Sequence, residues 1–267
     1  MTSTLISPQA SAPRAITSRP VAPASSPSLL RLTRVQLRAS RTTRAGMGLY
    51  LGTAVIAVAV AIVTNFTGGD AGHTLAQTYA NVAFSTGVLP PIIGLMLFTG
   101  EWSTRTTMTT FSLTPQRGRI ISAKLLAAVA LALTAFVFSL AVAAAGVAFG
   151  GGSGADTWTL GGQMLGQLAL FTTLVMLSGA TLGAAILNSP AAIVMYFAAP
   201  LAIEVLGLWS VVSDAIAWVS QGATFNRLAD GSLLTTSGWW HVLSGTGVWI
   251  VLPLAIGVWR IRRHDIA

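Results

Sequence analysis

Few side chains in this sequence are suited to catalysis or metal binding. The chain has no cysteine, and its three histidines, His73, His241 and His264, are widely separated. Asp70 and His73 stand three residues apart, but two potential ligands in a glycine-rich loop are weak support for a metal site. Neither the phosphate-binding pattern G-x-x-x-x-G-K-[ST] nor the nucleophile pattern G-x-S-x-G occurs. We therefore expect no enzymatic activity, no metal and no cofactor in this chain.

One acidic residue, Glu204, lies inside a long apolar stretch, about six residues or roughly 9 Å from its end. Acidic side chains at membrane depth are costly and often serve a function. Pro200, four residues earlier, lacks the N–H of a regular helix and can kink it. Two interpretations stay open: the carboxyl group is hydrogen-bonded to a neighbouring helix, or it takes part directly in moving a substrate or an ion.

The most informative polar segment covers residues 100–124. It begins with an acid, continues through a threonine-rich stretch with the spacing of a short amphipathic helix, and ends with a Thr-Pro step and basic residues. The charged and turn residues of this segment are Glu101, Arg105, Thr114, Pro115, Arg117, Arg119 and Lys124. A short helix held between two long helices would transmit the motion of a partner protein to both of them. The alternative is an ordinary solvated loop.

The composition predicts the elements that hold these residues. Hydrophobic residues make up 53% of the chain and charged residues 8%, with a mean hydropathy of +0.73, whereas a soluble domain carries about 25% charged residues. Such a chain cannot cover a water-facing surface, and we predict an all-α integral membrane protein. A membrane-spanning helix needs about 20 mostly apolar residues. Six stretches qualify: 49–66, 82–99, 120–149, 160–187, 191–209 and 242–259.

Basic residues are confined to alternate connections between these six stretches. Fourteen of the 15 basic residues precede the first span, lie between the second span and the start of the third, or follow the sixth. The other connections hold four aspartates and a single base: Asp70, Asp156, Asp214, Asp230 and Arg227. The positive-inside rule then predicts a multi-pass protein with both termini in the cytoplasm. Topology thus explains the net charge of +8, and we expect no nucleic-acid partner.

The regions outside the spans predict three further features. Residues 1–28 are rich in Ser, Pro and Ala and lack the apolar core of a signal peptide, so we predict a disordered cytoplasmic tail before a transmembrane domain at 29–267. In 29–46, arginines at spacings of three and four predict a helix lying on the inner membrane surface, although the same arginines could merely fix the topology. Residues 210–241 are predicted to form one or two short helices at the outer interface, beside an aromatic belt of Trp209, Trp239 and Trp240.

Glycines four residues apart occur repeatedly within the predicted spans. Such pairs let the backbones of two membrane helices approach closely. We interpret them as packing sites without a role in substrate binding: Gly48 and Gly52, Gly146 and Gly150, Gly162 and Gly166, and Gly179 and Gly183.

In their order and placement, these features resemble the permease subunit of ABC transporters of the ABC type-2 class. In that family an acid after the second span, a short coupling helix, and a Thr-Pro step followed by Arg and Lys form the loop that docks on the ATPase. The threonine-rich stretch 104–110 departs from the more usual Gly-Thr-Leu pattern. The resemblance covers about residues 29–267 and implies an N-terminal interfacial helix, six spans and short re-entrant helices between the fifth and sixth. The residues that match the docking loop are Glu101, Arg105, Thr114, Pro115, Arg119 and Lys124, with Arg117 beside them.

The resemblance also implies partners. The permease would pair with a second copy or a paralogue in the lipid bilayer, and separate ATPase subunits would hold ATP and Mg. Export is the expected direction, and the excess of arginine over lysine, 14 to 1, points to a bacterial cell membrane. Candidates for the translocation path are Phe84, Met96, Met195, Phe197 and Glu204.

Two other functions stay open at this stage. A secondary transporter or channel would use Glu204, and the prolines at 90, 91 and 200 would supply the broken helices of such proteins. A membrane scaffold without transport activity would keep the same topology but would need no ATPase.

Overall fold

The computed structural model describes residues 28–67, 74–103, 117–150, 154, 156–230 and 232–263. Within these ranges every regular element is a helix, which confirms the all-α prediction. The predicted tail lies outside the described residues, apart from Ser28. The helices are α1 (Leu29–Thr42), α2 (Arg44–Thr67), α3 (Leu75–Thr86), α4 (Pro90–Ser103), α6 (Arg117–Phe149), α7 (Gly162–Ile186), α8 (Ser189–Leu206), α9 (Ser213–Val219), α10 (Gln221–Phe225), η1 (Asn226–Leu228), α11 (Thr236–Thr246), η2 (Gly247–Val251) and α12 (Leu252–Arg263).

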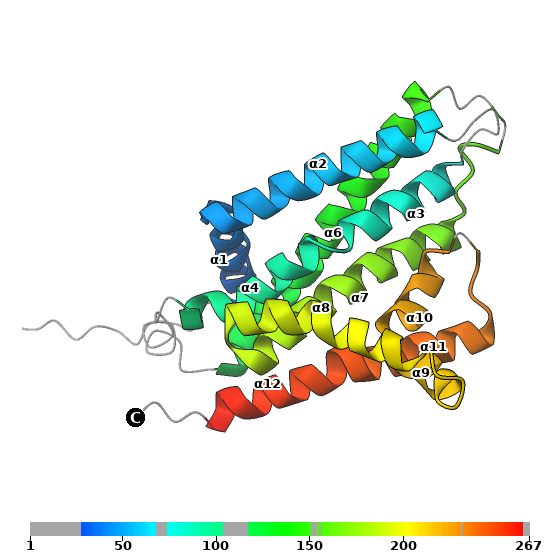
Figure 1. Ribbon diagram of the computed structural model, residues 1–267. Helices are drawn as coiled ribbons and strands as arrows, with labels where there is room; N and C mark the ends of the chain where they lie inside the picture. The colour runs from blue at the N-terminus through cyan, green and yellow to red at the C-terminus, as the bar shows by residue number, and fades with distance from the viewer. Residues whose placement is uncertain are drawn as a thin grey trace, which may run out of the picture.

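Long apolar helices occur at five of the six predicted spans. They run side by side along one direction and form a bundle (Figure 1). Each is long and apolar enough to cross a membrane, which makes the chain a membrane protein. These helices are Arg44–Phe66, Gly118–Phe149, Gly162–Ile186, Ser189–Leu206 and Thr236–Ile261.

The second predicted span, 82–99, is not a single helix in the structure. It is divided between α3 and α4, which are joined by residues 87–89 and together run the length of the bundle (Figure 1). Pro90 and Pro91 begin α4 and have no N–H with which to continue the hydrogen bonds of α3. The residue before a proline also avoids the helical conformation. The break therefore falls where the two prolines require it, and the apolar part of α4 is only Pro90–Gly100.

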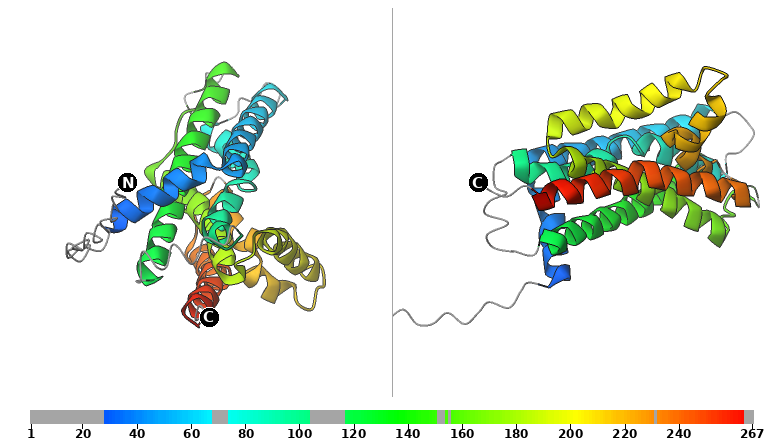
Figure 2. Two further views of the ribbon diagram at one scale, coloured as in Figure 1. Left: turned by 90° about the vertical axis from the view of Figure 1, so that its left-hand side faces the viewer. Right: turned by 90° about the horizontal axis from the view of Figure 1, so that it is seen from below.

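The helix α1 lies across one end of the bundle instead of along it (Figures 1 and 2). It begins at Leu29, as predicted, because the Ser28 side chain accepts a hydrogen bond from the backbone N–H of Arg31 at 3.3 Å. It ends at Thr42, four residues before the predicted end, where the chain turns into α2. Its arginines are largely exposed, while Thr33 is buried against the bundle. This orientation fits a helix at the membrane surface.

The two ends of the bundle carry different charges. At the α1 end lie the arginines of α1, the start of α2, the start of α6 and the end of α12, together with the end of α4 (Figure 1). At the opposite end lie α9, α10 and η1, so 210–241 contains three short helices where one or two were predicted. The described charged residues of that end are Asp156, Glu204, Asp214, Asp230 and Arg227.

Glycines bring the central helices into backbone contact. A Cβ atom on Gly94 of α4 would lie 2.8 Å from the Met176 carbonyl oxygen of α7, and α7 approaches α4 through Gly179 and Gly183 in the same way. Gly146 similarly faces Ala61 on α2. By contrast, no atom lies within 4 Å of a Cβ placed on Gly48, Gly162 or Gly166, so the packing interpretation of those pairs is wrong at these three positions.

Candidate functional site

The residues predicted to couple the chain to an ATPase lie at the α1 end of the bundle. Glu101 belongs to the last turn of α4, and Arg117 and Arg119 belong to the first turn of α6. Arg119 is half-buried, whereas the side chains of Glu101 and Arg117 are outside the described part of the chain. Arg105, Thr114 and Pro115 also lie outside the described residues, as does the predicted short helix between them. The structure therefore describes α4 and α6, the helices before and after this loop, but not the loop itself.

A buried lysine joins these two helices. Lys124 lies two turns into α6 and is only 4% exposed. Its Nζ atom lies 5.4 Å from the ring centroid of Phe98 on α4, within the range of a cation–π interaction. This contact joins the end of α4 to the start of α6.

Further hydrogen bonds tie α4 and α12 to the neighbouring helix ends. The Ser189 hydroxyl, at the start of α8, donates to the buried Thr99 Oγ1 atom of α4 at 2.8 Å. The Arg260 guanidinium of α12 donates to the carbonyl oxygen of Ala185 at 2.6 Å, which satisfies one of the free carbonyls at the end of α7. At this end of the bundle, side-chain contacts thus join α4 to α6 and α8, and α12 to α7.

The candidates for a translocation path do not converge on one cavity. Met96 is half-buried and lines a cavity of about 320 Å³ between α1, α4 and the start of α8. Met195 and Phe197 lie on α8 and are 45% and 43% exposed, so they face outward from the bundle. The side chain of Phe84 is outside the described residues.

Glu204 takes part in a polar network at the opposite end of the bundle. Its carboxylate oxygen Oε1 accepts a hydrogen bond from the hydroxyl of Ser220, which is 1% exposed and lies between α9 and α10. The next residue, Gln221, donates from Nε2 to the Ser178 hydroxyl of α7 at 2.9 Å. The side chain of Glu204 thus links α8 to the start of α10.

A π-helical turn interrupts the last long helix near this network. At η2 the carbonyl of Trp249 accepts a hydrogen bond from the buried Thr181 hydroxyl of α7 at 3.3 Å. The Trp249 indole Nε1–H donates to the carbonyl of Val219 at 2.7 Å. Such turns often occur at functional sites, and here the turn orients one indole toward the short helices. No sequence pattern predicted it.

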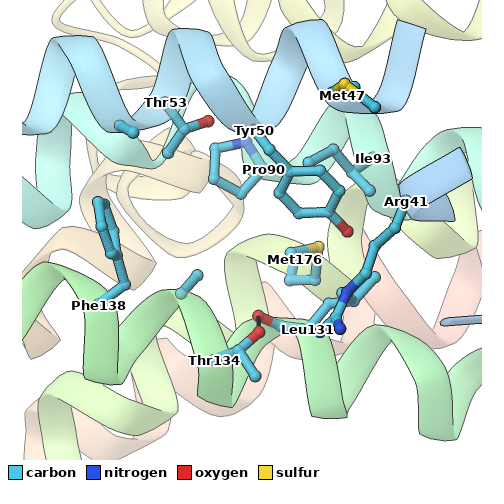
Figure 3. A pocket seen from close by; sticks show the side chains of 12 residues that line it. Arg41, Met47, Tyr50, Thr53, Pro90, Ile93, Leu131, Thr134, Phe138 and Met176 are labelled. Atoms are coloured by element: carbon cyan, nitrogen blue, oxygen red, sulfur yellow. Dashed lines mark hydrogen bonds between the residues drawn. The ribbon is translucent and has the colours of Figure 1, made fainter. Parts of the chain in front are cut away.

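A second cavity, beside α1, was not predicted from the sequence. It has a volume of about 440 Å³ and lies between α2, α4 and α6, beneath the end of α1 (Figure 3). Its lining is mainly apolar, with Pro90 at the helix break and Arg41 from α1. The arginine stripe of 29–46 predicted a surface helix, but it gave no signal for a cavity beneath that helix.

No protein-family model and no curated protein matches this chain. Its class is thus defined by the structure alone. It is a helical membrane protein with five helices able to span a bilayer and a pair of shorter helices, α3 and α4, that together run the length of the bundle. Among the residues that the structure describes, no three His, Asp or Glu side chains gather as a metal site. A function must therefore be argued from the two ends of the bundle.

Proposed function

We propose that this chain is the membrane-spanning permease subunit of an ATP-driven transporter of the ABC type-2 class, most simply an exporter. It receives the energy of ATP through the loop 101–119 from a separate ATPase subunit, which holds the ATP and Mg. The observation that carries the proposal is the junction of α4 and α6, where buried Lys124 lies 5.4 Å from the Phe98 ring. A partner that displaces the loop between these helices moves both of them together.

The arrangement of the other elements supports the same function. Together α3 and α4 would serve as a second crossing, which gives six crossings. The start of α1 and the end of α12 then lie at one end of the bundle (Figure 1). That end bears the arginines, so the positive-inside rule assigns it to the cytoplasm of a bacterial cell. The α1 helix then lies on the inner leaflet, and α9 and α10 lie at the outer face. The positions of α1 and of the short helices support the resemblance.

The transport cycle requires a second permease copy or a paralogue. The helix α8 offers a surface for it, because its outward face is apolar and exposed at Val194 (64%), Leu201 (65%) and Val205 (54%). A path formed between two copies would include Met195 and Phe197, which one chain leaves on its surface. Closure of the ATPases would then tilt α4 and α6 and switch the path from inward to outward access.

A secondary transporter is the second candidate, favoured by the helix break at residues 87–89. Its ion-coupling group would be Glu204, but this carboxylate is engaged by Ser220 in an anchoring contact. The scaffold hypothesis has no feature of its own in its favour.

Isolation of the tagged chain from its native membranes in mild detergent tests the proposal. A permease of this class brings with it a stoichiometric subunit that carries a G-x-x-x-x-G-K-[ST] motif. A correctly folded chain that purifies alone, without such a subunit, would favour the secondary transporter instead.

A further inference from the structure

The large cavity beneath α1 combines an apolar lining with one charged side chain. Figure 3 shows the Arg41 guanidinium group directed into the cavity beside Leu131 and Thr134. Among the described residues, Arg41 has no ion-pair or hydrogen-bond partner for its side chain. The volume of about 440 Å³ lies within the ordinary range of small-molecule sites. The apolar part of the lining comprises Met47, Ala54, Pro90, Ile93, Leu131, Ala135, Phe138 and Met176.

The other polar groups of the cavity already use their hydrogen atoms. The hydroxyls of Thr53 and Thr134 donate to carbonyls of their own helices, at 2.8 Å in both cases. The Ser40 hydroxyl donates to the carbonyl of Leu37 at 2.9 Å, so in its 3.2 Å contact with Tyr50 the tyrosine is the donor. Among the described residues that line the cavity, Arg41 is therefore the one whose side chain has free donors. A ligand would place an anionic group beside Arg41 and apolar groups elsewhere.

Exposed apolar side chains surround the cavity. Met47 and Phe138, which line it, are 61% and 39% exposed. The neighbouring surface is apolar on both sides, with Leu51 and Val55 exposed on α2 and Val137 exposed on α6. In a membrane protein such a surface contacts acyl chains.

We propose that the cavity binds an anionic phospholipid of the leaflet at the α1 end, with one acyl chain between α2 and α6 and the phosphate at Arg41. Charge complementarity selects the headgroup, and the apolar walls accept the chain. The bound lipid would fasten α1 to the bundle. This inference does not depend on the proposed ATPase partner.

Photolabelling of the full chain in vesicles of phosphatidylcholine and phosphatidylglycerol tests the inference. One sample contains a trace of phosphatidylglycerol with a diazirine in one acyl chain, and the other contains the matching phosphatidylcholine. We expect the anionic probe to label peptides that contain Met47 or Leu131 about fivefold more strongly, the effect of one arginine near an anionic headgroup. Equal labelling by the two probes would overturn the proposal.

Two pairs of variants make this test specific. Arg41→Gln should lower the labelling by the anionic probe to that of the neutral probe, whereas Arg34→Gln removes an exposed charge from the same helix and should change nothing. Ala54→Phe fills the cavity and should abolish the labelling of these peptides, whereas Ala59→Phe, on an exposed face of α2, should not. Equal effects of the two arginine variants would refute the site even where Ala54→Phe fails to fold.

Discussion

The backbone of Gly183 in α7 lies against Leu95 of α4, so that a Cβ atom on Gly183 would stand 2.5 Å from the Leu95 carbonyl oxygen. A residue with a side chain could not occupy this position without separating the helices. Between membrane helices, close contact of this kind replaces the hydrophobic effect as a source of stability. It fixes α4, the helix that leads to the proposed coupling loop, on the centre of the bundle.

We expect Gly183→Ala to lower the free energy of unfolding by about 1–3 kcal/mol, because the added methyl group has no space. Gly166→Ala in the same helix is the matched control. No atom lies within 4 Å of its added Cβ, so it should be neutral or stabilising by up to about 1 kcal/mol. Thermal unfolding in detergent, followed by circular dichroism, compares the two variants. Equal losses in both would contradict the packing described for α4 and α7.

The contact of Glu204 with Ser220 predicts which of the two residues matters more for stability. Ser220→Ala removes the partner of the carboxylate and the cap of α10, where the hydroxyl accepts from the Ala223 N–H at 3.0 Å. We expect a loss of about 1–2 kcal/mol. Glu204→Gln keeps an acceptor oxygen for Ser220 and should cost less. If unfolding experiments find Glu204→Gln the more damaging variant, the carboxylate has a role other than anchoring.

The charge distribution predicts which end of the bundle faces the cytoplasm. Because the chain has no cysteine, single cysteines can report on accessibility without a background. In intact cells a membrane-impermeant maleimide should label Ser237→Cys, at the exposed start of α11, but not Gly118→Cys at the exposed start of α6. Gly118→Cys should react after the membrane is permeabilised. The reverse pattern would show that the topology is inverted.

If the loop 101–119 docks on an ATPase, substitutions in it should weaken partner binding and leave folding unchanged. We expect Glu101→Ala or Arg119→Ala to reduce the amount of co-purified ATPase by about tenfold or more, since truncating a buried charged partner at an interface costs about 2–5 kcal/mol. The amount of permease in the membrane should not change. Arg34→Ala, an exposed charge on α1, is the control. If both loop variants retain the ATPase as well as the control does, the docking role is excluded.

The sequence predicted the positions of the five long helices, because a long apolar stretch is enough to locate a membrane-spanning helix. The predicted start of the fifth span at residue 191 lies two residues inside the observed helix, because Asn188 caps the backbone N–H of Ala191 at 3.1 Å and lets α8 begin at Ser189. The break between α3 and α4 had a local signal in Pro90 and Pro91. A hydropathy average does not show such a break, because it counts apolar side chains and does not record that proline lacks a backbone N–H.

Features that depend on distant contacts had no sequence signal. The π-helical turn at η2 is supported by Thr181, which is 68 residues away from Trp249 in the chain. The large cavity needs Arg41 of α1 and Leu131 of α6 to meet, which the spacing of the arginines could not predict. Glu204 could be recognised as unusual from the sequence, but its partner Ser220 could be found only in the folded chain.

Photocrosslinking from the start of α6 tests most directly whether an ATPase docks at the α1 end. A benzophenone maleimide attached to Gly118→Cys would report on neighbours of the loop, and the same reagent on Ser237→Cys would report on the opposite end. Our account predicts a crosslink from Gly118→Cys to a subunit with a G-x-x-x-x-G-K-[ST] motif and none from Ser237→Cys. The absence of this adduct at Gly118→Cys, in membranes where the chain is folded and inserted, would contradict it.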